Sequence, residues 1–229
     1  TGNSLARKVR LATIIGTIQS MADNFEYLRP EWRKNSIEER LLGVDITGQM
    51  DSEAARHIEN KEALKNFVER INEEYAERFG INKSASTTVV KPSGNSSQLV
   101  DCASGLHPRH AEYYYRHVRV AAESPVYKTL KEAGVQLFKE NGEEKKPDSE
   151  VQMWVARFLV KSPNGAITRH ELNVDDWVQI WLDNKIYWTT HNPSITINYK
   201  PDELFRLAEL IHENQEHIVG IAMLPFSAD

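Results

Sequence analysis

Helix and strand patterns alternate in the last quarter of the chain. A helix pattern over 174–185 precedes a strand pattern over 194–199. A second helix pattern opens at Pro201 and precedes a strand pattern over 218–224. Strands that are separated by helices of this length pair in parallel, because a crossover connection is needed to bring them side by side. This order predicts an α/β sheet that is covered on its outer face by helices.

The preceding part of the chain adds further helices and strands. Apolar residues at spacings of three and four predict a helix over 5–21 and a longer one that ends at Phe79, where Gly80 provides the C-terminal stop. Ser124 and Pro125 supply the N-cap and the first position of another helix. Strand patterns are found at 41–47, 86–90, 112–122 and 151–160.

The length of the chain bounds its domain organisation. A chain of 229 residues with 40% hydrophobic residues is long enough to bury one sizeable core. We therefore expect one domain, or part of one, over residues 1–229. The most polar stretch, at about 140–149, is expected to form a mobile surface loop.

Charge and cysteine content limit the partners and the compartment. The net charge of −5 argues against a nucleic-acid polymer as partner, since no continuous basic stretch is present. Cys102 is the single cysteine, which excludes an internal disulfide framework and a thiolate metal cluster and fits a cytoplasmic setting. The apolar runs are too short to span a bilayer. The eight histidines are not spaced so that a third residue could join a pair of them as a metal ligand. We expect neither a membrane anchor nor a metal site.

An anion-binding turn is predicted at 91–98, where Lys-Pro-Ser-Gly-Asn-Ser-Ser-Gln follows the strand pattern over 86–90. Pro92 cannot continue a strand ladder, and Gly94 lets the backbone come close to a ligand. The serine hydroxyls and the Asn95 amide can face a phosphate, and a helix that starts here would add its N–H groups. Composition alone favours an ordinary capped turn. The place of this turn at the carboxyl end of a strand favours a ligand site.

The same region carries a resemblance to a known family. Residues 90–97, 105–108 and 113–119 resemble the phosphate-loop region of adenosylcobalamin-dependent (class II) ribonucleotide reductases. Further blocks stand in the order expected for the triphosphate-reductase branch of this family, at 10–19, 27–30, 39–44, 194–197 and 220–225. The resemblance covers nearly the whole chain.

The resemblance implies a fold and an activity. The fold would be α/β, the C-terminal part of a ten-stranded α/β barrel. The activity would be an oxidoreductase reaction that uses adenosylcobalamin and a cysteine radical to convert ribonucleotides, here triphosphates, into deoxyribonucleotides for DNA synthesis. By matching the family motif, the residues that bind the substrate's phosphates would be Pro92, Ser93, Gly94, Asn95, Ser96 and Ser97.

The chain also departs from the family pattern. The finger-loop run Asn-Pro-Cys-Gly-Glu, which carries the radical cysteine, is absent, and one cysteine cannot form the redox pair. We read Cys102 as a structural thiol and assign no catalytic residue to this chain, which is expected to be inactive alone. The expected partners are an N-terminal part of the reductase that carries the finger loop and a thioredoxin-like reductant. The alternative is a non-catalytic nucleotide- or phosphate-binding or interaction module that uses the same loop.

Overall fold

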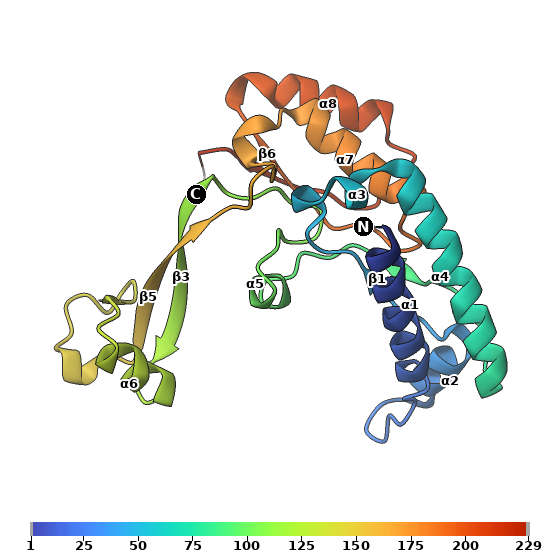
Figure 1. The fold of residues 1–229 in the computed structure, drawn as a ribbon, viewed down its shortest axis with the longest axis horizontal. Coiled ribbons are helices and arrows are strands. Elements are labelled where there is room, and N and C mark those ends of the chain that lie inside the picture. Colours follow the sequence, from blue (N-terminus) through green and yellow to red (C-terminus); the bar gives the residue numbers. More distant parts are fainter. Residues whose placement is uncertain (1, 228–229) are drawn as a thin grey trace. The chain divides into compact units, whose positions relative to one another are not determined.

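The computed structural model describes residues 2–227, which form two compact units. The first unit comprises the chain up to Arg109 and from Gly165 onwards, and the second comprises His110–Asn164. The long helices and the strands of the first unit are α1 (Gly2–Gln19), α2 (Pro30–Glu39), β1 (Val44–Asp45), α4 (Ile58–Phe79), β2 (Thr88–Val89), α7 (Val174–Tyr187), β6 (Thr196–Tyr199), α8 (Leu204–Glu213) and β7 (Ala222–Pro225) (Figure 1). Its short helical turns are η1 (Gln49–Asp51), α3 (Glu53–Arg56), α5 (Ser96–Leu99), η3 (Arg169–Glu171) and η4 (Pro201–Glu203).

The strands of the first unit pair in parallel, as predicted. β1 pairs with β2 in the register Val44↔Thr88, and β6 pairs with β7 in the register Thr196↔Ala222. These strands are shorter than their patterns predict. Around β2, the backbone N–H groups of Thr87 and Thr88 donate to the Thr190 hydroxyl, so a side chain occupies the place of a neighbouring strand.

Three tryptophans anchor the core of the first unit. Trp177, Trp181 and Trp188 are fully buried, and α7 lies between α4 and α8 (Figure 1). Two of these indoles also donate hydrogen bonds to the backbone beside the strands, Trp181 to Pro193 O and Trp188 to Val89 O. An acceptor offsets the cost of burying an indole N–H, and these two bonds fix α7 and its C-cap against β2 and the approach to β6.

Two of the predicted helix ends agree with the structure. Gly80 takes the left-handed conformation at the C-cap of α4, with φ of 65°. Ser124 caps α6 (Pro125–Glu132), its side chain accepting from the Val126 N–H. Both signals act locally, which is why the sequence is enough to locate them.

The second unit is an antiparallel sheet with one helix. β3 (Tyr113–Ala121) pairs with β5 (Met153–Lys161) along its whole length, and β4 (Leu137–Lys139) pairs with the other edge of β5. The two long strands form the extended ribbon seen in Figure 1. Tyr127 of α6 packs on Trp154 of β5, with ring centroids 5.6 Å apart. The strand patterns over 112–122 and 151–160 are thus confirmed as strands.

The polar stretch at 140–149 consists of turns that lead into η2 (Asp148–Glu150). The Glu143 carboxylate accepts from the N–H groups of Gln152 and Met153 at 2.9 and 3.0 Å, which ties the stretch to the start of β5. Its mobility stays a prediction.

The prediction of a fold that mixes helices and sheets is confirmed. In the described part of the chain the strands form two parallel pairs and one three-stranded antiparallel sheet, so the ten-stranded barrel stays a prediction. Between residues 2 and 227, every helix is too short or too polar to cross a bilayer.

Candidate functional site

The predicted anion loop leaves β2 at its carboxyl end. Val90 follows the strand, is fully buried, and accepts from the Ser194 N–H at 2.9 Å. The exposed Lys91 ammonium donates to Asn192 O and to the Ser194 hydroxyl at 3.1 and 2.7 Å. Both ends of β2 are therefore held by the segment that leads into β6. The loop therefore projects from a strand that is held in place.

Two serines of the loop brace it from inside. The Ser93 hydroxyl accepts from the Ser97 N–H at 2.9 Å, which satisfies one of the N–H groups at the start of α5. The Ser97 hydroxyl in turn donates to the Ser93 carbonyl, and Ser97 is fully buried. The predicted helix start is confirmed at Ser96, although α5 is a single turn. These two serines shape the loop, and a ligand outside it cannot reach the Ser97 side chain.

The remaining predicted residues lie on the surface of the loop. Pro92, Gly94, Asn95 and Ser96 are exposed. The Ser96 hydroxyl contacts the Ser93 hydroxyl. A Cβ added at Gly94 would meet nothing within 4 Å, so space remains open beside its backbone. The structure thus brings the six predicted residues into one turn and divides them into bracing and outward-facing groups.

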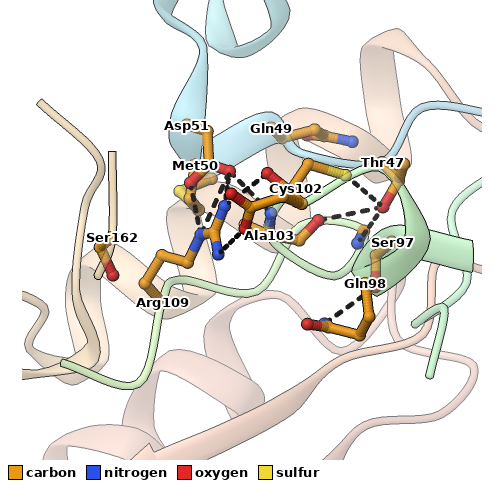
Figure 2. Close-up of polar contacts among 12 residues, drawn as sticks. Thr47, Gln49, Met50, Asp51, Ser97, Gln98, Cys102, Ala103, Arg109 and Ser162 are labelled. Atoms are coloured by element: carbon orange, nitrogen blue, oxygen red, sulfur yellow. Dashed lines mark hydrogen bonds and ion pairs between the residues drawn. The ribbon is translucent and has the colours of Figure 1, made fainter. Parts of the chain in front are cut away.

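The segment after α5 folds back onto the chain that follows β1 (Figure 2). The Thr47 hydroxyl donates to Ala103 O and accepts from the Gly105 N–H, both at 3.0 Å. The N–H of Gly48 also donates to Ala103 O, at 2.7 Å. Because β1 and β2 are parallel, their carboxyl ends meet at one edge, and these bonds close the loop against that edge.

A buried arginine fixes the same segment. The Arg109 guanidinium is turned toward Asp51 and donates to both of its carboxylate oxygens, at 2.8 to 3.2 Å (Figure 2). It also bonds the side chain and the carbonyl of Asp101, a residue with a positive φ of 47°. Asp51 accepts a further bond from the Ala103 N–H at 2.7 Å. A charge-assisted network of this kind holds residues 101–109 in one conformation.

Cys102 lies within this braced segment. Its sulfur is 3.9 Å from the Thr47 hydroxyl, and a Cβ added at Gly48 would lie 3.0 Å from the Cys102 Cβ. The side chain is half-buried. These contacts are those of a packed thiol, and its structural role stays a prediction.

Three carboxylates and one arginine of this site were missed by the sequence analysis. Asp45 accepts from the Lys91 N–H, and Asp51 and Asp101 hold Arg109. The available signal was the position of Asp45 near the end of the strand pattern over 41–47 and of Asp51 shortly after it, since polar residues at neighbouring carboxyl ends converge. Arg109 carried no comparable local signal.

Two curated proteins and one solved structure are similar to this chain. The adenosylcobalamin-dependent ribonucleoside-triphosphate reductase of Lactobacillus acidophilus is 26% identical over 169 residues, which cover 74% of this chain and 22% of the relative. The probable enzyme of that name from Dictyostelium discoideum is 26% identical over 211 residues, 87% of this chain and 26% of the relative. A crystal structure of a B12-dependent (class II) ribonucleotide reductase superposes with a TM-score of 0.82 at 17% identity, and the match covers 98% of this chain and 35% of that one.

The chain is similar to class II ribonucleotide reductases. The resemblance predicted from the ordered motifs is thereby confirmed, and the structural match shows a shared fold. No family model matches the chain. The chain spans about a quarter of the length of the curated reductases it matches.

Proposed function

We propose that this chain is part of an adenosylcobalamin-dependent ribonucleotide reductase and supplies the loop that holds the substrate's phosphates. One observation carries the proposal. In a chain similar to these reductases over most of its length, residues 91–97 leave a parallel strand at its carboxyl end and are braced from behind. The whole protein would convert ribonucleotides, triphosphates in particular, into deoxyribonucleotides.

The predicted residues take different roles in this proposal. The exposed Asn95 amide and Ser96 hydroxyl donate to phosphate oxygens, and the open space at Gly94 lets a phosphate approach the backbone. Ser93 and Ser97 hold the loop in shape, and Pro92 ends the strand without an N–H to satisfy. In this proposal Ser93 and Ser97 keep the loop rigid, and Asn95 and Ser96 donate hydrogen bonds to the anion.

The radical chemistry is assigned to another part of the protein. Adenosylcobalamin, when bound, supplies the radical that starts such a reaction. Cys102 does not fit the role of the radical cysteine, because its thiol is packed against Thr47 and Gly48. We therefore assign no catalytic residue here. The thioredoxin-like reductant and the cytoplasmic setting stay predictions from the resemblance.

The partner proposed for this chain is the N-terminal part of the same reductase, which would complete a ten-stranded barrel. A groove of about 940 Å³ lies beside β1 and is lined by α1, α2 and β1. Ile15 and Trp32 at this groove expose 62% and 55% of their surface, and among residues 2–227 no strand pairs with the second edge of β1. An open strand edge beside an apolar groove fits an added strand and its helix.

The longer relatives support this occupant, since about three quarters of their length lies outside the matched region. We expect size-exclusion chromatography to show self-association of the isolated chain or a stable complex with the finger-loop part. A dilute, well-folded monomer that does not bind the finger-loop part would contradict the proposed interface.

The role of the loop is tested by replacing Gly94 with Val. An added Cβ here meets no atom within 4 Å, so we expect the fold to stay intact, while the side chain occupies the space proposed for a phosphate. We expect weaker binding of inorganic tripolyphosphate and of ribonucleoside triphosphates in calorimetry. The matched control is Gly220→Val, where an added Cβ meets only Asn192 Nδ2 at 3.8 Å. Equal affinities for the wild type and Gly94→Val would remove the assigned role.

The reductase assignment needs a second experiment. The chain is mixed with a reductase part that carries the finger-loop cysteines, and conversion of ribonucleoside triphosphates is measured with and without adenosylcobalamin. We expect conversion only with both present. Binding of tripolyphosphate without any conversion would favour the alternative, a phosphate-binding module without radical chemistry.

A further inference from the structure

We propose that His107 is a positioning residue for the phosphate loop and that it acts through Ser104. The inference rests on the proposed function, because it assigns His107 a role in the geometry of that same loop. His107 itself is not expected to touch a ligand.

The imidazole of His107 connects two segments that are far apart in the chain. Its Nε2 accepts from the Thr196 N–H of β6 at 3.0 Å, and its Nδ1 lies 3.2 Å from Ser104 O. A ring nitrogen that accepts a hydrogen bond carries no proton, so the proton of the neutral ring sits on Nδ1 and is donated to the Ser104 carbonyl. Trp177 packs edge-on against the ring, with centroids 6.2 Å apart, and fixes its orientation.

The environment of His107 favours this neutral form. Burial lowers the pKa of His107 below its usual value, because a charged imidazole loses hydration in this place. The ring therefore serves as one donor and one acceptor between β6 and the segment behind the loop.

Ser104 connects His107 to the loop through a hydrogen bond. Its hydroxyl donates to Ser93 O at 3.2 Å, and the same carbonyl also accepts from the Ser97 hydroxyl. The Ser93 carbonyl and the Gly94 N–H belong to one planar trans peptide unit, so they point in opposite directions. Fixing the carbonyl therefore fixes the orientation of the peptide unit between Ser93 and Gly94, at the point where the proposed function places a phosphate.

A histidine that only fills space would behave differently. Loss of packing at His107 would lower stability, and its effect on the loop would add to the effect of losing the Ser104 hydroxyl. A relay from His107 through Ser104 to Ser93 makes the two effects non-additive, because either change breaks the same link.

The experiment is a double-mutant cycle on the whole chain, with affinity for inorganic tripolyphosphate measured by calorimetry. We expect His107→Leu and Ser104→Ala each to weaken binding about fivefold, the size of one hydrogen bond. The double variant should also be weakened about fivefold. His107→Gln, which can keep an acceptor near the Nε2 position, should lose less than His107→Leu. The control His57→Leu removes an exposed histidine and should bind like the wild type.

The outcomes separate the inference from the function on which it rests. Variants that bind as well as the wild type, or a double variant weakened by the product of both factors, about 25-fold, would overturn the positioning role while the loop keeps its function. A wild-type chain that does not bind tripolyphosphate would overturn both. If His107→Leu does not fold, the cycle is run with His107→Gln and Ser104→Ala, and the same criterion of additivity decides.

Discussion

The backbone N–H of Lys91 donates to Asp45 Oδ2 at 3.2 Å, which joins the carboxyl ends of β2 and β1. Crowding by protein atoms raises the pKa of Asp45 to about 6, although the residue reaches solvent on one side. The N–H groups of Lys91 and Ile46 and the Lys91 charge offset only part of this effect. The hydrogen bond that joins the two strand ends thus uses a carboxylate whose ionised form is disfavoured in the folded chain.

Asp45→Asn should raise stability at neutral pH. Because the folded-state pKa is raised, the folded chain binds the proton more tightly, and the contribution of Asp45 to stability falls as pH rises from about 4 to about 6. Asparagine keeps an oxygen that accepts from Lys91. We expect a gain of about 1 kcal/mol at pH 7, reduced from the full effect by solvent screening, and no gain at pH 4. Urea unfolding at both pH values measures it, and an equal gain at both would contradict the prediction.

Lys61→Met should stabilise the chain in a pH-dependent way. Lys61 of α4 is buried, and this burial lowers its pKa to about 8, with Asp183 opposing and Arg56 adding to the effect. The protonated form is therefore disfavoured in the folded state, and the stability of the wild type rises with pH between about 8 and 10.5. We expect Lys61→Met to gain about 2 kcal/mol at pH 7 and progressively less above pH 8.

The control for this prediction is Lys8→Met on the exposed surface of α1, which should change stability by less than about 0.5 kcal/mol. Chemical unfolding at pH 7 and pH 9.5 is the measurement. A gain for Lys61→Met that grows with pH would show that the ammonium is not penalised by burial.

Local signals account for the parts of the fold that were predicted. Gly80 and Ser124 mark helix ends because their conformational preferences act on the adjacent turn. α2 escaped prediction, since it contains no buried residue and its sequence has no apolar stripe. Its C-cap is Arg40, which adopts a positive φ and whose guanidinium donates to Ser20 O. That contact joins residues 20 positions apart, and no local pattern encodes it.

In the candidate site, too, local features were predictable and contacts between distant residues were not. The loop at 91–97 was predictable because Pro92 and Gly94 follow a strand pattern. Which serines turn inward was not, because the bonds between Ser93 and Ser97 depend on where α5 begins. The pairing of Arg109 with Asp51, across 58 positions, depends on the parallel approach of β1 and β2.

Arg109→Met should be strongly destabilising. The change leaves the Asp51 carboxylate in a largely buried place without its cation, and removing one partner of a buried pair costs about 3 kcal/mol or more. The control is Arg119→Met on β3, which removes the exposed partner of the ion pair with Glu140 and should cost less than about 1 kcal/mol. Thermal unfolding compares the two, and similar shifts would contradict the assigned importance of the buried network.

Gly105→Ala tests the close approach of the two chain segments behind the loop. Gly105 has a positive φ of 58°, and an added Cβ would lie 3.0 Å from Lys91 O, a backbone atom that cannot move without shifting the loop. Gly134→Ala is the matched control, since its φ is 71° but its Cβ would meet nothing within 4 Å. The left-handed conformation alone costs about 1 to 2 kcal/mol in both variants.

The contact with Lys91 O should add to this loss only at Gly105, by about 1 kcal/mol or more, the usual size of an overpacking effect. It should also displace the start of the loop. We therefore expect Gly105→Ala to unfold at a lower temperature than Gly134→Ala and to bind tripolyphosphate more weakly than the wild type, whereas Gly134→Ala keeps the wild-type affinity. Equal stabilities and equal affinities would show that Lys91 can yield without disturbing the loop, so that its position does not depend on the glycine behind it.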